Sequence, residues 1–304
     1  MRFGINLPNF GSGIDPSTLQ GWATTAERLG YHLLTVSDHI ALTPDAHSRS
    51  PAPFYDSFTT LAWLAGQTST IELGTGVAIV PHRHPLQLAR VSASLDRLSG
   101  GRLILGVGVG WARHAFQALG VPYERRGALT DEYLSALRVL WTEDVASFHG
   151  PTVDFDGIHT APRPARSPHP PIWVGGNSRA AVRRAARYGD AWHPMWPQGP
   201  ELAPALKTLA ADAAAAGRPT PAFCPTIPLA VTSRPVPDHL RRLGQGTLEQ
   251  LHADLVLLDR LGAQYVGLNT ELGDHRRRRP AEDDWAIFEH LADTVLDTTG
   301  ESVR

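Results

Sequence analysis

Hydrophobic and polar residues alternate along the chain with two different periods. Short segments rich in apolar and β-branched residues, such as residues 71–80, are typical of buried strands. Between them, segments such as 85–101 repeat apolar residues at the spacing of an amphipathic helix. Asp15 and Pro16 are typical of a helix start, and Gly30 of its end. The pattern therefore predicts strands and helices in turn.

The predicted elements alternate over the whole chain. The strands are expected at residues 2–8, 32–40, 71–80, 102–110, 172–176, 190–196, 222–232 and 265–270. The helices are expected at residues 15–30, 57–69, 85–101, 130–141, 178–189, 201–217, 247–262 and 285–296. This order and the length of 304 residues favour an α/β protein with the (β/α)8 TIM barrel fold. A doubly wound open sheet is the alternative, and it more often stops at about five or six strands.

Two long segments without a regular pattern, residues 40–56 and 149–171, interrupt the alternation. We interpret them as insertions into a single domain of residues 1–304. Active sites of this fold lie at the carboxyl ends of the strands. We expect both insertions at that face, where long loops are candidate lids.

Composition narrows the function. Hydrophobic residues make up 42% of the chain and charged residues 19%, as in ordinary globular proteins, and the formal net charge of -2 argues against a nucleic-acid partner. Cys224 is the only cysteine, which excludes an internal disulfide and a multi-thiolate metal site. The start of the chain lacks the apolar core of a signal peptide, and no apolar run is long enough for a membrane span. We therefore expect a cytoplasmic protein without a membrane partner.

Hydrolytic chemistry finds little support at the predicted strand ends. A glycosidase needs two facing carboxylates, and Asp38 and Glu271 are the nearest candidates. His82 and His84 have a zinc-ligand spacing, but they follow the strand and are interpreted as loop residues, so no metal is expected. Cys224 lies inside a predicted strand and is interpreted as a core residue.

Two other strand ends carry more chemistry. Gly175 and Gly176 end a strand before a helix capped by Asn177 or Ser178, so free N–H groups could bind a phosphate there, with Arg179 adding charge. An ordinary capped turn is the alternative. Asp38 and His39 end another strand, where a histidine can donate a hydrogen bond or a proton, or serve only as a buried polar group.

Glycines alternate in the segment GRLILGVGVGWARH. Gly106, Gly108 and Gly110 are two residues apart, which is the period of a strand and not the spacing of a dinucleotide-binding loop. Their shared face is therefore bare, and it would let a backbone or a flat ligand approach closely.

Three segments carry a resemblance to a known family. They are TVSDHI, ELGTGVAIVPHRHPLQLARVSASLDRLSGGRLILGVGVGW and PIWVGGNSRAAVRRAARYGDAWHP. Together they resemble the bacterial luciferase-like family, or luciferase-like monooxygenase superfamily, and within it the branch of oxidoreductases that depend on the deazaflavin coenzyme F420. The resemblance covers nearly the whole chain and implies a TIM barrel with the cofactor ring across its mouth.

The resemblance also implies roles for residues. His39 matches the group that hydrogen-bonds or protonates the reacting centre, and the pair Gly76–Val77 matches a non-prolyl cis peptide that backs the ring. The glycine-faced strand is implied to give the ring and its ribityl chain room. The implied cofactor-binding residues are Asp38, Gly76, Val77, Ala78, Gly108, Gly110, His114, Gly175, Gly176, Asn177, Ser178 and Arg179.

This chain departs from the family pattern after the glycines. Where sugar-phosphate dehydrogenases of the family carry a catalytic glutamate, this chain has Trp111, so we expect a different substrate. Trp111 and Trp196 are expected to line an apolar or aromatic substrate pocket. The run HRRRRP, residues 275–280, is interpreted as a solvated basic loop or as a site for an acidic tail or substrate.

The expected function is F420-dependent hydride transfer to, or oxidation of, a small organic substrate. The alternative is a two-component monooxygenase that uses FMNH2, since no residue pattern distinguishes F420 from FMN. A catalytically silent flavin-binding barrel is a third hypothesis. The expected partners are a small-molecule substrate, a flavin or F420 reductase and a second copy of the chain in a homodimer.

Overall fold

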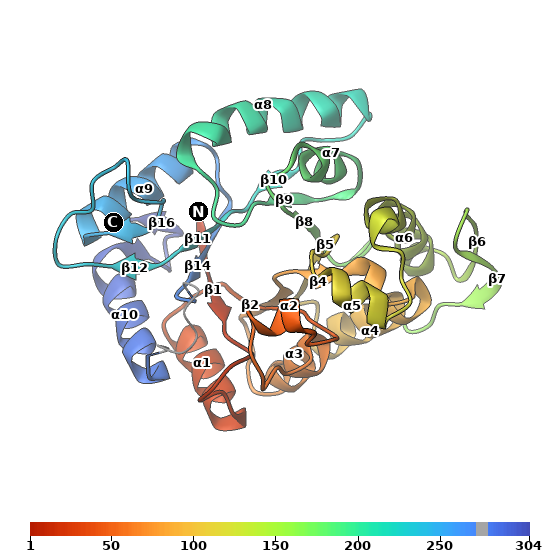
Figure 1. The fold of residues 1–304 in the computed structure, drawn as a ribbon, viewed down its shortest axis with the longest axis horizontal. Coiled ribbons are helices and arrows are strands. Elements are labelled where there is room, and N and C mark those ends of the chain that lie inside the picture. Colours follow the sequence, from red (N-terminus) through yellow and green to blue (C-terminus); the bar gives the residue numbers. More distant parts are fainter. Residues whose placement is uncertain (272–278) are drawn as a thin grey trace.

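Parallel strands form the centre of the protein, whose computed structural model describes residues 1–271 and 279–304 (Figure 1). Their order in the sheet is β10-β9-β8-β5-β3-β2-β1-β14-β11, with β4 paired to β5. The strands are β1 (Arg2–Leu7), β2 (Leu33–Val36), β3 (Glu72–Thr75), β4 (Ala78–Ile79), β5 (Leu103–Gly108), β8 (Ile172–Gly175), β9 (Ala191–His193), β10 (Ala222–Phe223), β11 (Thr226–Pro228) and β14 (Tyr265–Asn269).

The sheet closes on itself because β10 and β11, two consecutive halves of one crossing of the sheet, pair with its two opposite edges. β10 pairs with β9, whereas β11, which begins after Cys224 and Pro225, pairs with β14 at the other edge. In the same way β4 continues the pass begun by β3. The ten strands of the sheet thus make eight passes, which confirms the predicted (β/α)8 barrel.

A ring of helices packs around the barrel (Figure 1). These helices are α1 (Pro16–Arg28), α3 (Ser57–Ala65), α4 (Pro85–Leu98), α6 (Arg126–Thr142), α7 (Arg179–Tyr188), α8 (Gly199–Ala215), α9 (Leu248–Arg260) and α10 (Ala281–Thr294). The predicted cap of α1 is present, since Asp15 Oδ1 accepts a hydrogen bond from the Thr18 backbone N–H at 2.8 Å.

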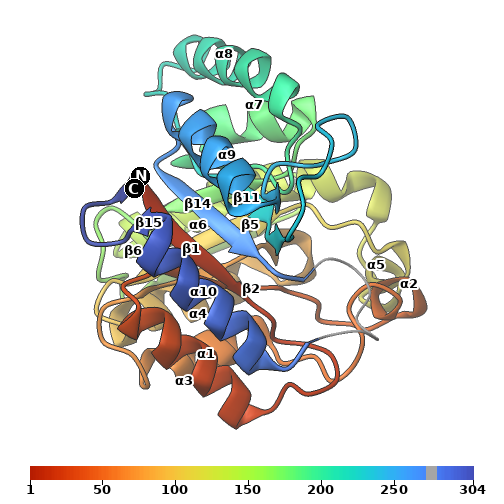
Figure 2. The same ribbon diagram turned by 90° about the vertical axis from the view of Figure 1, so that its left-hand side faces the viewer.

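Short elements lie in the connections. The short α-helices are α2 (Pro44–His47) and α5 (Arg113–Ala118). The 3-10 helices are η1 (Val80–His82) and η2 (Tyr123–Arg125). The minor strand pairs consist of β6 (Val145–His149), β7 (Asp154–His159), β12 (Ala230–Val231), β13 (Gln245–Gly246), β15 (Leu296–Asp297) and β16 (Ser302–Val303). α2 and α5 lie together at one end of the barrel, and both termini lie at the other (Figure 2).

The barrel interior is filled in layers, as the alternation of side chains along a strand requires. An apolar layer of buried residues closes the lower part of the barrel: Leu33, Ile104, Trp173, Ala191 and Cys224. Two residues further along β1 and β2, Asn6 and Thr35 are register partners, and the Thr35 hydroxyl donates to Asn6 Oδ1 at 3.2 Å. The interior therefore changes from apolar to polar toward the carboxyl end.

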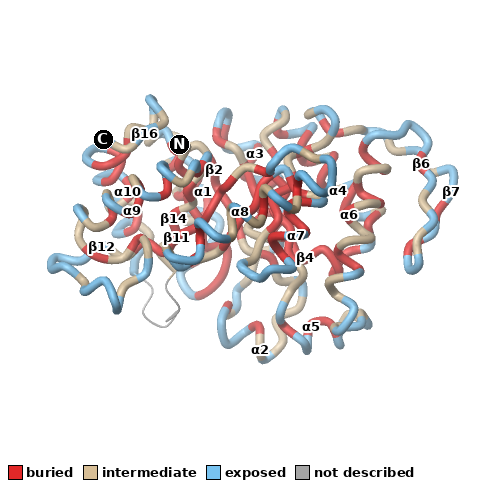
Figure 3. Tube along the Cα trace, turned by 90° about the horizontal axis from the view of Figure 1, so that it is seen from above, coloured by how far each residue is buried: buried red, intermediate tan, exposed pale blue. Residues whose placement is uncertain are grey.

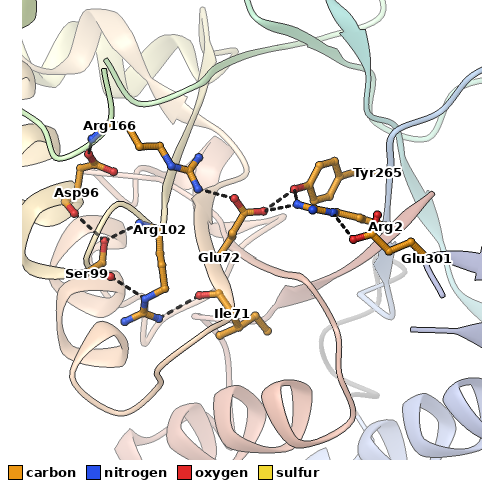
Figure 4. A network of polar contacts seen from close by, with 9 residues as sticks. All are labelled: Arg2, Ile71, Glu72, Asp96, Ser99, Arg102, Arg166, Tyr265 and Glu301. Atoms are coloured by element: carbon orange, nitrogen blue, oxygen red, sulfur yellow. Dashed lines mark hydrogen bonds and ion pairs between the residues drawn. The ribbon is translucent and has the colours of Figure 1, made fainter. Parts of the chain in front are cut away.

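A network of charged residues closes the amino end (Figure 4). Glu72, the first residue of β3, accepts hydrogen bonds from Tyr265 Oη at 2.5 Å and from Arg166 Nη2 at 2.6 Å. Arg2 donates to Tyr265 Oη at 2.9 Å and pairs with Glu301 at 2.8 Å. Strands β1, β3 and β14 are thus tied together at their first residues.

The segment 149–171 does not lie where the sequence analysis expects it. It follows α6, and helices of a (β/α)8 barrel return the chain to the amino end of the next strand. Arg166 accordingly contacts Glu72 at that end. The β6–β7 hairpin projects from the body beside α6, with much of its surface exposed (Figure 3). The segment 40–56, which contains α2, does lie at the carboxyl end with α5.

Candidate functional site

Asp38, just after β2, is fixed by a buried ion pair. Arg83 Nη1 and Nη2 donate to its two carboxylate oxygens at 2.7 and 2.9 Å, and the two side chains are only 1% and 7% exposed. The Ile79 N–H and the Ser57 hydroxyl add hydrogen bonds of 2.9 and 3.0 Å. Four donors occupy the roughly four acceptor positions of a carboxylate. Asp38 therefore holds the end of β2 against the turn after β4, and its implied contact with a cofactor stays a prediction.

His39, unlike Asp38, leaves a polar atom without a hydrogen bond in the described part of the chain. Its Nδ1 atom is buried and has no hydrogen-bond partner among the described residues. The ring is held edge-on by Phe54 and Trp111, at centroid distances of 5.5 and 5.7 Å. Burial lowers the pKa of His39, although the charges of Asp38 and Asp45 oppose the shift. His39 is therefore a neutral imidazole near pH 7 with unused hydrogen-bonding capacity.

The loops beside His39 are held by an asparagine and an aromatic stack. Asn9 donates to the carbonyl oxygens of Ser37 at 3.0 Å and Tyr55 at 2.8 Å, and its Oδ1 accepts from the Ser37 N–H at 3.1 Å. Phe10 stacks on Phe54, with ring centroids 5.2 Å apart. These contacts join the ends of β1 and β2 to the 40–56 loop.

α2 and α5 form a roof over this part of the mouth. Small side chains pack between them, including Ala46 and Ala115. Asp45 accepts from the His114 N–H at 3.3 Å, and His114 Nδ1 lies 3.2 Å from the same carboxylate. Burial opposes the charge of Asp45, but hydrogen bonds from Thr43 and His114 outweigh it and lower the pKa of Asp45 to about 2. The structure thus uses His114 to hold the roof, and its implied contact with a cofactor stays a prediction.

The Gly76–Val77 peptide bond is cis, as the resemblance predicts. It separates β3 from β4, whose first residue Ala78 is buried and pairs with Val107 of β5. The segment leaves the plane of the sheet here.

This bulge confirms one of the two neighbours expected at the glycine face of β5, a close backbone, and corrects the implied room for a ring. A Cβ atom at Gly106 would lie 1.9 Å from the Thr75 carbonyl oxygen, and one at Gly108 would lie 2.6 Å from Val77. A Cβ at Gly175 would lie 2.9 Å from Val77 as well. The bare face is therefore filled by the chain itself, because the neighbouring strand needs the room to bulge. It does not lie open to a ring.

Gly110 is required for a different reason, its backbone conformation. Its φ of +78° is in the left-handed region, and a Cβ there would lie 2.7 Å from Ile79 and 2.9 Å from Phe116. A glycine is thus required for the turn that carries Trp111 to the mouth. The implied contacts of Gly108 and Gly110 with a cofactor stay predictions.

The start of α7 has the geometry expected of an anion site. Ser178 is the N-cap, and its hydroxyl accepts from the Ala181 N–H at 3.2 Å. The first N–H groups of a helix have no partner within the helix and point outward. Gly176 precedes them with a φ of +115°. The Asn177 side chain instead binds the Met195 backbone. Its Nδ2 donates to the Met195 carbonyl oxygen at 2.7 Å, and its Oδ1 accepts from the Met195 N–H at 3.0 Å.

Arg179 is turned away from that helix start. Its guanidinium pairs with Asp212 of α8, with one Nη2–Oδ1 distance of 3.0 Å. The phosphate contact predicted for Arg179 stays a prediction, and it would require exchange of this partner.

The two predicted pocket tryptophans both follow strands at the carboxyl end. Trp111 follows β5 and is 40% exposed beside His39. Trp196 follows β9, with its Nε1 buried and without a partner in the described part of the chain. The backbone φ of Trp196 is +51°, which is left-handed, and its backbone N–H donates to the Thr226 carbonyl oxygen at 2.7 Å. Both indoles thus stand at the mouth.

The hydrolytic alternatives do not assemble. His84 Nδ1 accepts from the Leu86 N–H and caps α4, whereas the His82 ring packs against Phe116 at 4.6 Å, so the two histidines do not converge. Cys224 is buried in the barrel, and burial raises the pKa of its thiol. Within residues 1–271 and 279–304, no group of three or more His, Cys, Asp and Glu side chains could hold a metal ion.

Arg83 is the site residue that sequence reasoning missed. It lies between the two histidines of HRH, which the sequence pattern places in a loop. A buried aspartate at a strand end requires a cation, and this requirement was the available signal. Of the basic run 275–280, residues 275–278 lie outside the described residues, and Arg279 pairs with Asp284 at 3.2 Å.

In the described residues, no helix is both long and apolar enough to cross a membrane.

Known proteins resemble this chain in sequence and in fold. An uncharacterized protein of Mycobacterium tuberculosis is 32% identical over 255 residues, which cover 80% of this chain and 87% of that protein. An FMNH(2)-dependent dimethylsulfone monooxygenase of Pseudomonas putida is 36% identical over 129 residues, or 41% of this chain and 35% of that enzyme. The structure of a coenzyme F420 dependent tetrahydromethanopterin reductase from Methanopyrus kandleri superposes with a TM-score of 0.75 at 17% identity, over 96% of this chain and 97% of that one.

According to their names, the monooxygenase depends on FMNH(2) and the reductase on coenzyme F420. The luciferase-like monooxygenase family matches residues 1–298 of this chain, almost its whole length. The protein therefore belongs to the luciferase-like monooxygenase family.

Proposed function

We propose that this protein is an oxidoreductase that uses coenzyme F420 for hydride transfer to, or oxidation of, a small apolar or aromatic organic substrate. The observation that carries the proposal is the unpartnered Nδ1 of His39 at the barrel mouth. A buried polar atom without a partner costs roughly 1–3 kcal/mol, so proteins retain one where a ligand completes it.

The residues at the mouth fit a flat ring with a phosphate-bearing chain. The Gly76–Val77 bulge presents backbone beside the mouth, and the start of α7 supplies free N–H groups and the Ser178 hydroxyl. The φ of +115° at Gly176 is a conformation that favours glycine, so this turn presents bare backbone. A ring against the bulge and a phosphate at the helix start would use both features.

A bound deazaflavin or flavin would supply the hydride or the electron pair of the reaction. The protein supplies the remaining parts. His39 has one N–H and one lone pair at neutral pH, so it can donate to a substrate oxygen or transfer a proton to it. Trp111 and Phe54 fix the imidazole plane, and the α2–α5 roof would limit access of water once the cofactor is bound.

A two-component monooxygenase that uses FMNH2 is the second candidate function. The sequence similarity to the dimethylsulfone monooxygenase of Pseudomonas putida favours it. The two candidates share the phosphate site and differ in the ring that the mouth accepts.

Paired titrations of the purified protein with oxidised F420 and with FMN test the proposal, with visible absorbance and ring fluorescence as signals. We expect F420 to bind at micromolar concentrations or below, and FMN more weakly. Tighter binding of FMN would move the function to the second candidate. If neither bound, the cofactor assignment would be wrong.

A matched pair of cap variants locates the phosphate. Ser178→Ala removes the hydroxyl that caps α7, and Thr247→Ala removes the one that caps α9. Each is expected to cost about 1 kcal/mol of stability. Only Ser178→Ala should also weaken cofactor binding. Equal binding by the two variants would place the phosphate elsewhere.

A further inference from the structure

Two arginines lie on the two tryptophans of the mouth. The Arg49 Cζ atom is 4.7 Å from the ring centre of Trp111, and the Arg242 Cζ atom is 5.8 Å from that of Trp196. Both distances are within the range of a cation–π contact. Arg49 comes from the 40–56 loop and Arg242 from the loop between β12 and β13, so the two pairs come from separate loops.

The tryptophans are held in place more firmly than the arginines. Trp196 is fixed through its N–H to Thr226 and through the two hydrogen bonds of Asn177 to Met195. Trp111 is fixed by Gly110 and by its contact with His39. Both guanidinium groups belong to exposed residues.

Neither guanidinium has a carboxylate partner among residues 1–271 and 279–304. Acids near them are already occupied: Asp45 accepts from Thr43 and His114. Asp238 and Asp254 both pair with Arg241, the residue next to Arg242. The two positive charges at the mouth are therefore free to take a negative charge from a ligand.

An arginine in cation–π contact with an indole recognises particular chemistry. The indole holds the guanidinium in place, while N–H groups at the edge of the guanidinium plane can bind a carboxylate through two parallel hydrogen bonds. The neighbouring indole surface favours a flat or apolar group. Together these features select a ligand that combines a carboxylate with such a group.

We propose that Arg49 and Arg242, with Trp111 and Trp196, form an anion-binding rim that takes a carboxylate-bearing ligand at the mouth of the site. This inference rests on the proposed function only for the location of the site. The carboxylate has two possible sources. One is the substrate, and the other is an acidic extension of the cofactor, which F420 carries as a glutamate tail and FMN lacks.

The experiment uses Arg49→Gln, Arg242→Gln and the double variant of the full chain. Arg260→Gln is the matched control, because Arg260 is exposed at the end of α9 that leads into the amino end of β14. The probes are oxidised F420, FMN, cinnamate and its neutral analogue cinnamamide. Binding is followed by tryptophan fluorescence and, for the cofactors, by absorbance.

We expect the wild type to bind a probe with a carboxylate that reaches the rim more tightly than the matched probe without one. Weakening of F420 by about fivefold in each single variant and more than tenfold in the double variant, with FMN unchanged, would assign the rim to the cofactor tail. The same loss for cinnamate, with F420 unchanged, would assign it to the substrate. Arg260→Gln should change neither.

The proposal is overturned if the double variant binds F420 as the wild type does and the wild type binds cinnamate no better than cinnamamide. Failure of the proposed function gives a different result, because neither F420 nor FMN would then bind the wild type. The cinnamate and cinnamamide arm still decides the rim in that case.

Discussion

Glu72 at the amino end of the barrel and three ring side chains at the carboxyl end hold their polar atoms in opposite conditions. At the amino end, both oxygens of Glu72 accept hydrogen bonds, and Arg2 and Tyr265 complete the network (Figure 4). At the carboxyl end, His39, His82 and Trp196 each bury a ring nitrogen that has no partner in the described part of the chain. The first arrangement is typical of a structural network, and the second of a surface that awaits a ligand.

The difference in hydrogen bonding between these groups is also a difference in free energy. Each unpartnered buried group costs roughly 1–3 kcal/mol, whereas a completed hydrogen bond to a charge contributes about as much stability. The carboxyl end is therefore less stable than it could be, and the amino end offsets part of that cost. Changes at the two ends should thus separate stability from binding and catalysis.

Asp38 is where this comparison breaks, because it is fully partnered although it lies at the carboxyl end. Asp38→Ala leaves the buried Arg83 with only the half-exposed Asp56, 3.2 Å from its Nη2, as countercharge, and it frees the end of β2 that carries His39. We expect the free energy of unfolding to fall by about 3–5 kcal/mol, with cofactor binding impaired as well. Urea denaturation measures the first effect. A loss below about 1 kcal/mol would show that the pair is not structural.

His39→Gln sharpens the comparison from the functional side. We expect turnover with reduced cofactor and a substrate found by screening to fall by about 100-fold, because a positioned proton donor contributes at least that much. Stability should remain within about 1 kcal/mol of the wild type, since the imidazole Nδ1 has no partner to lose. Unchanged turnover would remove His39 from the chemistry.

Glu72→Gln is the opposite case. It removes the charge that pairs with Arg166 and lies 4.0 Å from Arg2, so stability should fall by roughly 1–3 kcal/mol. F420 or FMN affinity should not change, because the network is at the far end of the barrel. A large change in affinity with an unchanged melting temperature would contradict the division between the ends.

His82→Phe gives the smallest effect, and it depends on pH. Burial lowers the pKa of His82 to about 4, against the opposing charge of Asp38, and the charge of Arg83 lowers it further. The unfolded chain thus binds a proton between about pH 6.5 and pH 4 that the folded protein does not, and stability falls as the pH drops through this range.

Phenylalanine at position 82 cannot titrate, so the stability of the variant should fall less steeply between about pH 7 and pH 4.5. Urea midpoints at several pH values test this. His290→Gln, an exposed histidine on α10, is the control and should keep the slope of the wild type. Parallel slopes for all three proteins would show that His82 does not contribute.

The sequence was sufficient for the barrel because its signals are local. Strand and helix periods, the cap at Asp15 and the regular alternation each depend on neighbouring residues, and the structure confirms them. The placement of 149–171 was wrong although the rule that corrects it is equally simple. A segment that follows a helix returns to the amino end.

The candidate site was predictable only in part. Its position at the strand ends was predicted from the barrel pattern, and the cis Gly76–Val77 bond from the resemblance. The partners did not, because Arg83 on Asp38, Asp212 on Arg179 and Asp45 on His114 join residues far apart in the chain. Sequence patterns name candidate groups, but long-range packing decides which of them remain free.

The space around Val77 has a consequence for protein engineering. Gly106, Gly108 and Gly175 leave no room for even one methyl group beside the bulge, so they act as a single coupled set in which a change at one position cannot be absorbed by the others. Combinatorial libraries that aim at new substrates should keep these three codons fixed. Diversity is better placed at positions 49, 111 and 242, whose side chains are exposed at the mouth.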